Sequence, residues 1–377
     1  MKTFFGICLF LLATNAMSIE IESEDSQDRV PGRYLVWMKT PANLRSSFQI
    51  MGDSGARVIH TYPAILPNVI AVQADDDALD VLRNDPNVLR IKADKIYRAV
   101  AVQPTKANGL DRIDSTNGRD GNYTFTRTGK GVHAYIIDTG IRSTHKEFIG
   151  RIGAGFDALK DGRGTEDCNG HGSHVAGTVG GATAGVAKEV TLHPVRVLNC
   201  RGAGNLSNVL AGINFVAQNA IKPAVANMSL GGERDADLDA AVNTAIINGV
   251  SFAVAAGNEN QDACNVSPAA VANAITVAAT KAANDNRASF SNFGSCVDIF
   301  APGSAILSAG IKTDTSTAVL DGTSMSSPHV AGAIALLLEQ FPTASPVQIA
   351  TMLTERSSKN VVIDPKGSPN RMLFTQP

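Results

Sequence analysis

Three residues that lie far apart in the sequence have the side-chain types of a serine nucleophile and its supporting acid–base pair. Ser324 stands at the expected start of a helix, His171 lies between two glycines at another expected helix start, and Asp138 ends an apolar run. A serine hydroxyl is a weak nucleophile unless a neighbouring base takes its proton, and histidine titrates close to working pH. A carboxylate that ends a buried strand is costly unless it is paired. Together the three residues fit an acyl-transfer site.

Ser324 alone fits two interpretations. Small residues precede it and a long apolar run, 330–341, follows it. One interpretation is an ordinary N-cap serine on a buried helix. The other is a nucleophile at the positive end of a helix dipole, where backbone N–H groups can stabilise an oxyanion. Asp138 and His171 upstream favour the second interpretation.

The strands and helices that would position these residues are predicted from apolar runs without polar alternation. Such runs, with helices between them, indicate a parallel sheet that is covered on both faces. Functional groups in such sheets gather in the loops after the carboxyl ends of the strands. We therefore expect an α/β fold with strands at 132–138, 190–198, 224–230, 250–256 and 275–279, and helices at 172–179, 206–219 and 235–248.

The first hundred residues have a different organisation. Residues 1–17 have a positive start, an apolar stretch too short to span a bilayer and small residues near a cut, which is typical of a secretory signal. Residues 18–29 are predicted to be an acidic, flexible lead-in. Residues 30–99 are expected to form a small ferredoxin-like α+β unit, and 100–108 an exposed linker. The elements expected in the small unit are strands at 34–38, 58–62, 69–73 and 88–92 and helices at 43–52 and 76–84.

Charge and cysteine content exclude several classes of protein. Lys and Arg total 33 against 35 for Asp and Glu, and they are interspersed, so we expect no nucleic-acid partner. No later segment is apolar enough to span a membrane, so we expect no membrane partner. After the signal an even set of cysteines remains, which in an exported chain suggests two disulfides with three possible pairings. A four-cysteine zinc site is the alternative, but it lacks a CxxC pair. The cysteines are Cys168, Cys200, Cys264 and Cys296.

Six segments of the chain resemble the subtilisin-like serine peptidases. Asp138, His171 and Ser324 stand in IIDTGI, NGHGSHVAG and GTSMSSPHVAG, and the runs NMSLGG, VAAGN and FSNFGSCVDIFAPG are similar to the proteinase K branch. The resemblance covers residues 109–377. It implies a three-layer subtilisin-like fold with a mostly parallel sheet, a secreted, monomeric serine endopeptidase that acts on proteins and peptides, and no cofactor for catalysis.

The resemblance also implies roles for individual residues. Ser324 would attack the scissile carbonyl, His171 would transfer the proton and Asp138 would hold the imidazolium. Asn258 would donate to the oxyanion together with the Ser324 backbone N–H. Val266 would form the floor of the pocket for the residue before the cut, which suggests a preference for apolar side chains. The residues expected to bind substrate are Gly202, Ala203, Gly204, Ser229, Leu230, Gly231, Gly232, Ala255, Ala256 and Gly257.

Three further features follow from the resemblance. It pairs Cys168 with Cys200 and Cys264 with Cys296. It implies a structural calcium ion on Asp298 with the carbonyl groups of Ala272 and Ala274, although relatives commonly have proline at the position of Ala272. Residues 30–99 resemble the family's propeptide, which would act as an intramolecular inhibitor and be cut off between residues 99 and 103.

Two other classes of function compete with this expectation. A non-catalytic relative would keep the fold as a peptide-binding module, but the intact set of Asp138, His171, Ser324 and Asn258 argues against it. A nucleotide-binding α/β protein would need GxGxxG opening the helix after the first strand, and the run IDTGIRSTH has none.

Overall fold

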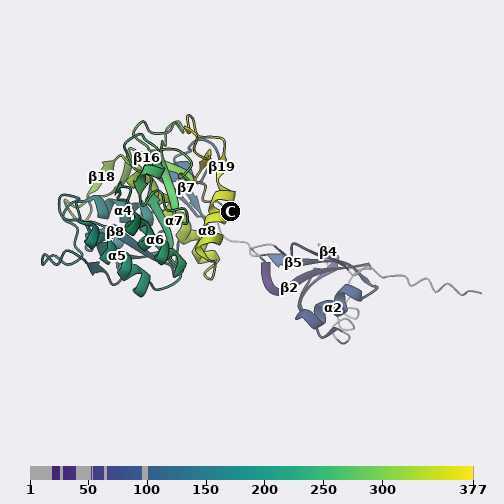
Figure 1. Ribbon diagram of the computed structural model, residues 1–377. Coiled ribbons are helices and arrows are strands. Elements are labelled where there is room, and N and C mark those ends of the chain that lie inside the picture. Colours follow the sequence, from purple (N-terminus) through teal and green to yellow (C-terminus); the bar gives the residue numbers. More distant parts are fainter. Residues whose placement is uncertain are drawn as a thin grey trace, which may run out of the picture. The chain divides into compact units, whose positions relative to one another are not determined.

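The computed structural model describes residues 19–25, 29–39, 52, 54–62, 66–95 and 101–376. The chain divides into two compact units, residues 1–99 and 100–377 (Figure 1). The expected signal and all but the last residue of the helix expected at 43–52 lie outside the described residues.

The first unit is a five-stranded sheet with a helix, α2 (Asp76–Asn84). Asp75 caps this helix by accepting the N–H of Ala78 at 2.9 Å, and Leu79 and Leu82 are buried in the unit's core. The four long strands run antiparallel to their neighbours in the order β5-β2-β4-β3, which is the strand order of the split ferredoxin-like arrangement. The strands are β1 (Ile21–Glu22), β2 (Arg29–Met38), β3 (Arg57–Tyr62), β4 (Leu66–Gln73) and β5 (Val88–Lys95).

The prediction of a flexible lead-in over residues 18–29 is wrong for Ile21 and Glu22. They form β1, which pairs in parallel with β5. Ile21 is buried in the core of the first unit, and Glu22 forms an ion pair with Arg90. A strand of two residues has no recognisable alternation of apolar and polar side chains, so the sequence of this acidic stretch does not reveal it.

The expected exposed linker also differs in the structure. Residues 101–104 form β6 (Ala101–Pro104), which pairs antiparallel with β7 (Asn122–Phe125) in the second unit. The Gln103 Nε2 donates to Thr183 O at 3.0 Å. Most β6 side chains are exposed, so its sequence carries no apolar pattern although its backbone is paired.

The second unit is built on a nine-stranded sheet in the order β19-β20-β16-β15-β13-β11-β8-β10-β9. Every neighbouring pair is parallel except β19 and β20. The runs expected to be strands correspond to β8 (His133–Asp138), β10 (Thr191–Arg196), β11 (Ala224–Met228), β13 (Ser251–Ala255) and β15 (Ile275–Lys281). Sheet strands outside those runs are β9 (Phe156–Asp157), β16 (Ile299–Ser304), β19 (Ser358–Lys359) and β20 (Arg371–Met372).

Helices cover both faces of this sheet (Figure 1). Successive residues of β8 alternate between two cores: Ile136 packs in the core with α4 and α7, and Ile137 packs in the core with α5 and α6. The expected three-layer α/β fold is therefore confirmed. The helices are α3 (Asn108–Ile113), α4 (His171–Gly180), α5 (Leu206–Asn219), α6 (Ala236–Ile247), α7 (Thr323–Gln340) and α8 (Pro346–Arg356). Short elements complete the unit: η1 (Lys146–Phe148), η2 (Ala263–Asn265), β12 (Gly232–Glu233), β14 (Val266–Ser267), β17 (Ile306–Ala309) and β18 (Thr317–Leu320).

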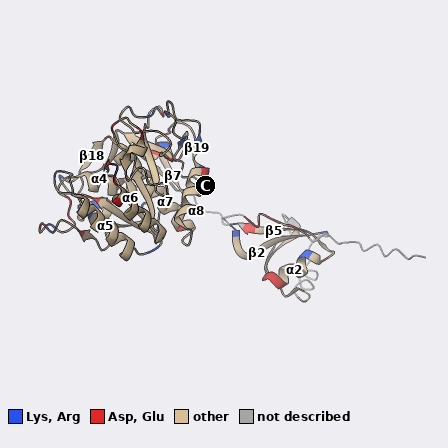
Figure 2. Cartoon of the chain, in the orientation of Figure 1, with Lys and Arg blue, Asp and Glu red and all other residues tan. Residues whose placement is uncertain are grey.

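Two disulfides join loops of the second unit, Cys168–Cys200 and Cys264–Cys296, with the pairing that the resemblance implies. Acidic and basic residues are interspersed along the chain (Figure 2). Among the described residues, no helix is both long and apolar enough to cross a membrane.

Candidate active site

Asp138 and His171 meet where β8 ends and α4 begins. The His171 Nδ1 lies 2.8 Å from Asp138 Oδ1 and 2.9 Å from Oδ2. Asp138 is fully buried, and its Oδ1 also accepts the N–H of Thr139 at 2.7 Å. These contacts satisfy the buried carboxylate and fix the orientation of the imidazole ring.

The close approach of α4 to the end of β8 depends on a glycine. A Cβ at Gly172 would lie 2.2 Å from the carbonyl oxygen of Gly140. No side chain larger than hydrogen fits there without moving the helix. Gly172 therefore allows α4 to bring His171 within hydrogen-bond distance of Asp138.

The charge around His171 favours its protonated form. Burial lowers the pKa of this imidazole, but the charge and hydrogen bond of Asp138, with a further contribution from the charge of Asp167, outweigh burial. The pKa of His171 is therefore raised above its ordinary value. A proton taken from a nucleophile is held more strongly by such a base.

Ser324 is the second residue of α7, the long helix whose remaining length lies in the core. The helix is capped by Gly322, whose φ of 146° is a conformation that L side chains rarely adopt. The Ser324 Oγ donates to Ser229 O at 3.1 Å, and the Ser229 Oγ donates back to Ser324 O at 2.8 Å. In this structure Asp138 is thus hydrogen-bonded to His171, while the hydroxyl of Ser324 is hydrogen-bonded to the carbonyl oxygen of Ser229.

Asn258 lies beside the start of α7. Its Oδ1 accepts two hydrogen bonds from Thr323, from the backbone N–H at 2.8 Å and from Oγ1 at 3.0 Å. The amide group is held by its oxygen, so its NH₂ is the half that remains to donate. The backbone N–H of Ser324 belongs to the first helical turn, which has no intrahelical acceptor. Asn258 and Ser324 line one cavity, and they can supply it with two donors.

Two neighbouring cavities hold the expected substrate-binding residues. The first, of about 410 Å³, is lined by Ser324, Asn258, Ala255, Gly257 and Val266 among others. The second, of about 570 Å³, is lined by His171 together with Gly202, Ala203, Gly204 and Ser229. The two share one wall, made of Leu230, Gly231, Gly232 and Glu233.

Ala256 does not line either cavity, contrary to expectation. It is fully buried in a separate apolar cluster with Ala263, Val266 and Phe300. Ala256 comes directly after β13, and its neighbours Ala255 and Gly257 line the first cavity. Neighbouring residues of an extended chain point to opposite sides, so three consecutive residues cannot all face one pocket.

Carboxylates that the sequence did not single out also line the first cavity. They are Glu233 and Glu259. The Glu259 Oε2 accepts a hydrogen bond from Asn292 Nδ2 at 2.8 Å, which holds this side chain beside Gly257. Val266 is 5% exposed and contributes an apolar surface, as expected. The signal that could have revealed Glu259 is its position directly after Asn258.

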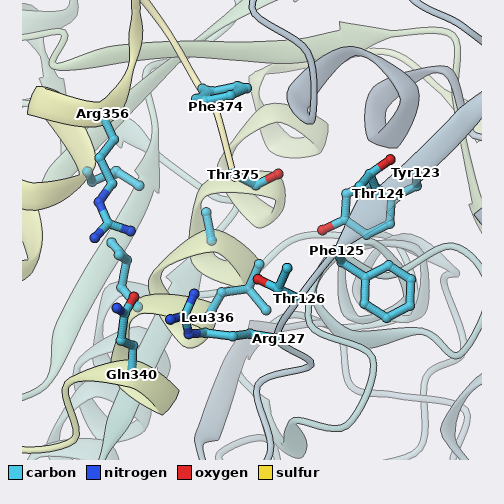
Figure 3. Close-up of a pocket in the computed structure, with 13 residues that line it drawn as sticks. Tyr123, Thr124, Phe125, Thr126, Arg127, Leu336, Gln340, Arg356, Phe374 and Thr375 are labelled. Carbon is cyan, nitrogen blue, oxygen red and sulfur yellow. The ribbon is translucent and has the colours of Figure 1, made fainter. Parts of the chain in front are cut away.

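A third cavity lies between β7, α7, α8 and the residues after β20 (Figure 3). It is lined by Tyr123, Phe125, Arg127 and Arg356 among others, and by none of the expected site residues. Its volume is about 20 Å³. A volume of that size accommodates one water molecule and excludes a peptide side chain.

Asp298 directly precedes β16 and lines neither of the two cavities. Its Oδ2 accepts the N–H of Thr276 at 2.8 Å, and burial raises its pKa to about 6. The hydrogen bond from Thr276 and the positive charge of Arg371 oppose this rise only in part. Thr276 follows Ala274 by two residues, so the expected carbonyl partner lies in the same strand region. Among the described residues, no group of three or more His, Cys, Asp or Glu side chains is arranged to hold a metal ion.

Comparisons with known proteins agree with this geometry. The family model described as "Subtilase family" matches residues 129–372. An "Extracellular serine proteinase" from Thermus sp. (strain Rt41A) is 50% identical, covering 93% of this chain and 91% of that protein. The "Subtilisin-like serine protease AsES" from Sarocladium strictum is 45% identical over 80% of this chain and 78% of its own length. A crystal structure of a cold-adapted subtilisin-like serine proteinase matches with a TM-score of 0.70 and 50% identity, covering 72% of this chain and 98% of its own. The chain belongs to the subtilase family of serine peptidases.

Proposed function

We propose that this subtilase hydrolyses peptide bonds through an acyl-enzyme formed on Ser324. The chain is a serine endopeptidase. The observation that supports these residue roles is the His171–Asp138 pair, 2.8 Å apart, in which His171 lines the cavity that shares a wall with the one that Ser324 lines. No cofactor is needed for this chemistry, because the nucleophile, the base and the oxyanion donors are all protein groups.

In the proposed mechanism the Ser324 hydroxyl leaves Ser229 O and donates to the Nε2 of His171. Asp138 holds the Nδ1–H, so Nε2 is the nitrogen that is free to accept. As Oγ attacks the carbonyl carbon, its proton moves to Nε2, and the imidazolium is stabilised by Asp138. His171 then gives the proton to the leaving amine. A water molecule then attacks the acyl-enzyme. His171 takes the proton of the water and returns it to the Ser324 oxygen as the acyl product leaves.

The oxyanion that forms would accept from the Asn258 NH₂ and from the Ser324 backbone N–H. Asn258 is held in this orientation before substrate arrives, because Thr323 occupies its oxygen. Donors that are already aligned do not have to reorganise during the reaction, which is the main source of their catalytic effect.

Substrate would bind as an extended strand between the segments 202–204 and 229–232, which both line the second cavity. The apolar surface of Ala255, Leu230 and Val266 supports a preference for apolar side chains before the cut. Glu233 and Glu259 lie in the lining of the same cavity, so a long side chain with a terminal cation would also be accepted there.

The chain would be secreted and made as a zymogen. Residues 1–17 would be removed as a signal, residues 30–99 would assist folding and inhibit the cleft, and maturation would cut before β6. The relative from Thermus is named as extracellular, which supports export. The mature enzyme would act on proteins and peptides as a monomer.

A structural calcium ion would be held by Asp298 with the carbonyl oxygens of Ala272 and Ala274. The buried carboxylate, with a pKa raised to about 6, fits a hard cation with oxygen ligands. Asp298→Asn should abolish the calcium-dependent rise in thermal unfolding temperature. A rise that persists in the variant would place the ion elsewhere.

The decisive test of the residue roles is Ser324→Ala in the full chain. We expect the variant to accumulate as uncut precursor and to react with no organophosphonate, while the wild type is labelled once, at Ser324, as shown by intact mass. Ser295→Ala, at an exposed serine, is the matched control and should process normally. Normal processing of purified Ser324→Ala would contradict autocatalytic maturation. A wild type that is folded but not labelled would favour a non-catalytic, peptide-binding relative.

A further inference from the structure

We infer that Asp167 is a positioning residue for catalysis: it fixes the first turn of α4 against the end of β8 and adds a second negative charge beside His171. This inference rests on the proposed role of His171 as the base. Asp167 lies in the loop before α4, four residues before His171, and its own side chain lines neither cavity.

The carboxylate of Asp167 accepts five hydrogen bonds. Its Oδ1 accepts the backbone N–H groups of Asn169 and Gly170, each at 2.9 Å, and the hydroxyl of Thr139 at 2.9 Å. Its Oδ2 accepts the backbone N–H of Ser173 at 2.8 Å and the Ser173 hydroxyl at 2.7 Å. These donors belong to the residues on both sides of His171, so a single carboxylate determines the backbone path through this residue.

The same carboxylate connects the elements that carry His171 and Asp138. The Thr139 hydroxyl, which donates to Asp167, accepts the N–H of Gly172 at 2.9 Å. The Thr139 backbone N–H donates to Asp138 Oδ1. Asp167, Thr139 and Asp138 therefore form a continuous chain of contacts between the loop before α4 and the end of β8. Asp167 is only 9% exposed, so water does not compete for these bonds.

Asp167 acts on His171 in two ways: its hydrogen bonds position the residue, and its negative charge affects the imidazole. It contributes to the raised pKa of His171, after burial and the Asp138 contributions. Several other charged groups in the loops beside α4 have partners of their own. His174, on the same helix, has its pKa lowered to about 4 by burial and is neutral at working pH. The remaining charged contacts are Arg142–Asp314 and Arg196–Asp161, both at 2.7 Å, and Glu166 with the N–H of Ser143.

The first experiment measures kcat, KM and the pH profile of kcat/KM for Asp167→Asn on an apolar peptide amide. The substitution removes the charge and replaces one acceptor by an NH₂ group. We expect kcat to fall by about ten- to a hundredfold, because the imidazole is displaced, while KM stays close to wild type. The acidic midpoint of the kcat/KM profile should move to lower pH, because the imidazolium loses a neighbouring negative charge.

Asp161→Asn is the matched control. It removes one carboxylate charge from the same loop, but this carboxylate pairs with Arg196 and is not among the groups that act on the pKa of His171. We expect its acidic midpoint to equal that of wild type. An Asp167→Asn variant with the wild-type kcat, or with a wild-type acidic midpoint, would overturn the inference. A merely structural role would lower the yield of active enzyme without moving the midpoint.

Ser173→Ala keeps the inference testable if Asp167→Asn does not fold. It removes one of the five hydrogen bonds and leaves the charge in place. We expect a several-fold lower kcat, an unchanged KM and an unchanged acidic midpoint. A wild-type kcat would contradict the positioning role. Failure of the proposed function itself has a different signature: in that case Ser324→Ala retains activity, or the wild-type profile shows no acidic limb.

Discussion

The two helices that carry the reactive side chains begin in similar ways but are held by different groups. Both α4 and α7 start after a glycine with positive φ, Gly170 at 107° and Gly322 at 146°, and neither glycine can supply a side-chain cap. A carboxylate, Asp167, accepts the N–H groups at the start of α4. A neutral amide, Asn258, accepts the backbone N–H of Thr323 at the start of α7.

The difference matches the charge that each end must stabilise. In the proposed mechanism the imidazolium of His171 is positive, so a carboxylate at its helix would stabilise the transition state as well as the fold. The proposed oxyanion beside Ser324 is negative, and a carboxylate there would oppose it. An amide binds the helix with its oxygen and leaves its NH₂ to donate. Each capping group therefore suits the sign of the charge that the proposed mechanism forms next to it.

The largest expected effect comes from reversing this difference at α7. Asn258→Asp keeps the oxygen that accepts from Thr323 but replaces the donor by a negative charge. Loss of one oxyanion donor typically lowers kcat by about 10²–10³, and the added charge should make the loss larger than in Asn258→Ala. Steady-state kinetics of the two variants at equal active-site titre measures the difference. Equal activities would contradict the charge argument.

Acid stability tests a feature that the two helices share. Each carries a buried histidine, His174 on α4 and His329 on α7, and burial lowers the pKa of each to about 4. The unfolded chain binds these protons near pH 6.5, so the stabilisation is complete above that pH and is lost as pH falls toward 4. The loss should reach up to about 3 kcal/mol per histidine. Denaturant unfolding between pH 7 and 4 measures it, and His329→Gln should flatten the curve.

A smaller effect should follow when the amide is kept but loosened. Thr323→Val removes the hydroxyl that donates to Asn258 at 3.0 Å and accepts the N–H of Gly257 at 3.1 Å. The backbone N–H of residue 323 still holds the amide, so kcat should fall by roughly fivefold, the equivalent of about 1 kcal/mol for one hydrogen bond. The acidic midpoint should not change, in contrast to Asp167→Asn. A shifted midpoint would show that the two helix ends are not independent.

The last comparison concerns the effect of the two glycines on stability. Alanine at Gly322 must adopt a φ near 146°, a region that is essentially limited to glycine, which costs about 1–3 kcal/mol. Alanine at Gly170 would place its Cβ 3.3 Å from Ile311, in a left-handed conformation that costs about 1–2 kcal/mol. Thermal unfolding of both variants ranks the two positions. A larger loss at Gly170 would show that contact with Ile311 outweighs backbone strain.

Five strands of the central sheet, β8, β10, β11, β13 and β15, were predictable because they are buried on both faces, whereas β16, which is also buried, was not predicted. Their apolar runs end close to the observed strand ends, and Asp138 lies at the end of its run. Short strands such as β19 and β20 have two residues each, which is too short for any periodicity. The β6 strand was missed because it is held by backbone hydrogen bonds and most of its side chains are exposed, so its sequence has no apolar pattern.

The candidate site was predictable where a motif sets local geometry and was not where tertiary contacts set it. The motifs placed His171 and Ser324 at helix starts, as observed. They did not distinguish Ala256, which points away from the cavity, from Ala255 beside it. Asp167 carries no signal of its own, since one acidic residue in a polar loop is ordinary. Its importance emerges only when the fold brings its five donors together.

In the proposed mode of substrate binding, the wall shared by the two cavities limits how selectivity can change. Leu230, Gly231, Gly232 and Glu233 form one side of both spaces. A substitution there that narrows one space displaces the backbone that bounds the other, so preferences at two positions of the substrate would change together. Residues that line one cavity only, such as Val266 and Leu206, are the places where one preference can be altered alone. Substitutions in the shared wall are therefore expected to change two substrate preferences together, and substitutions outside it to change one.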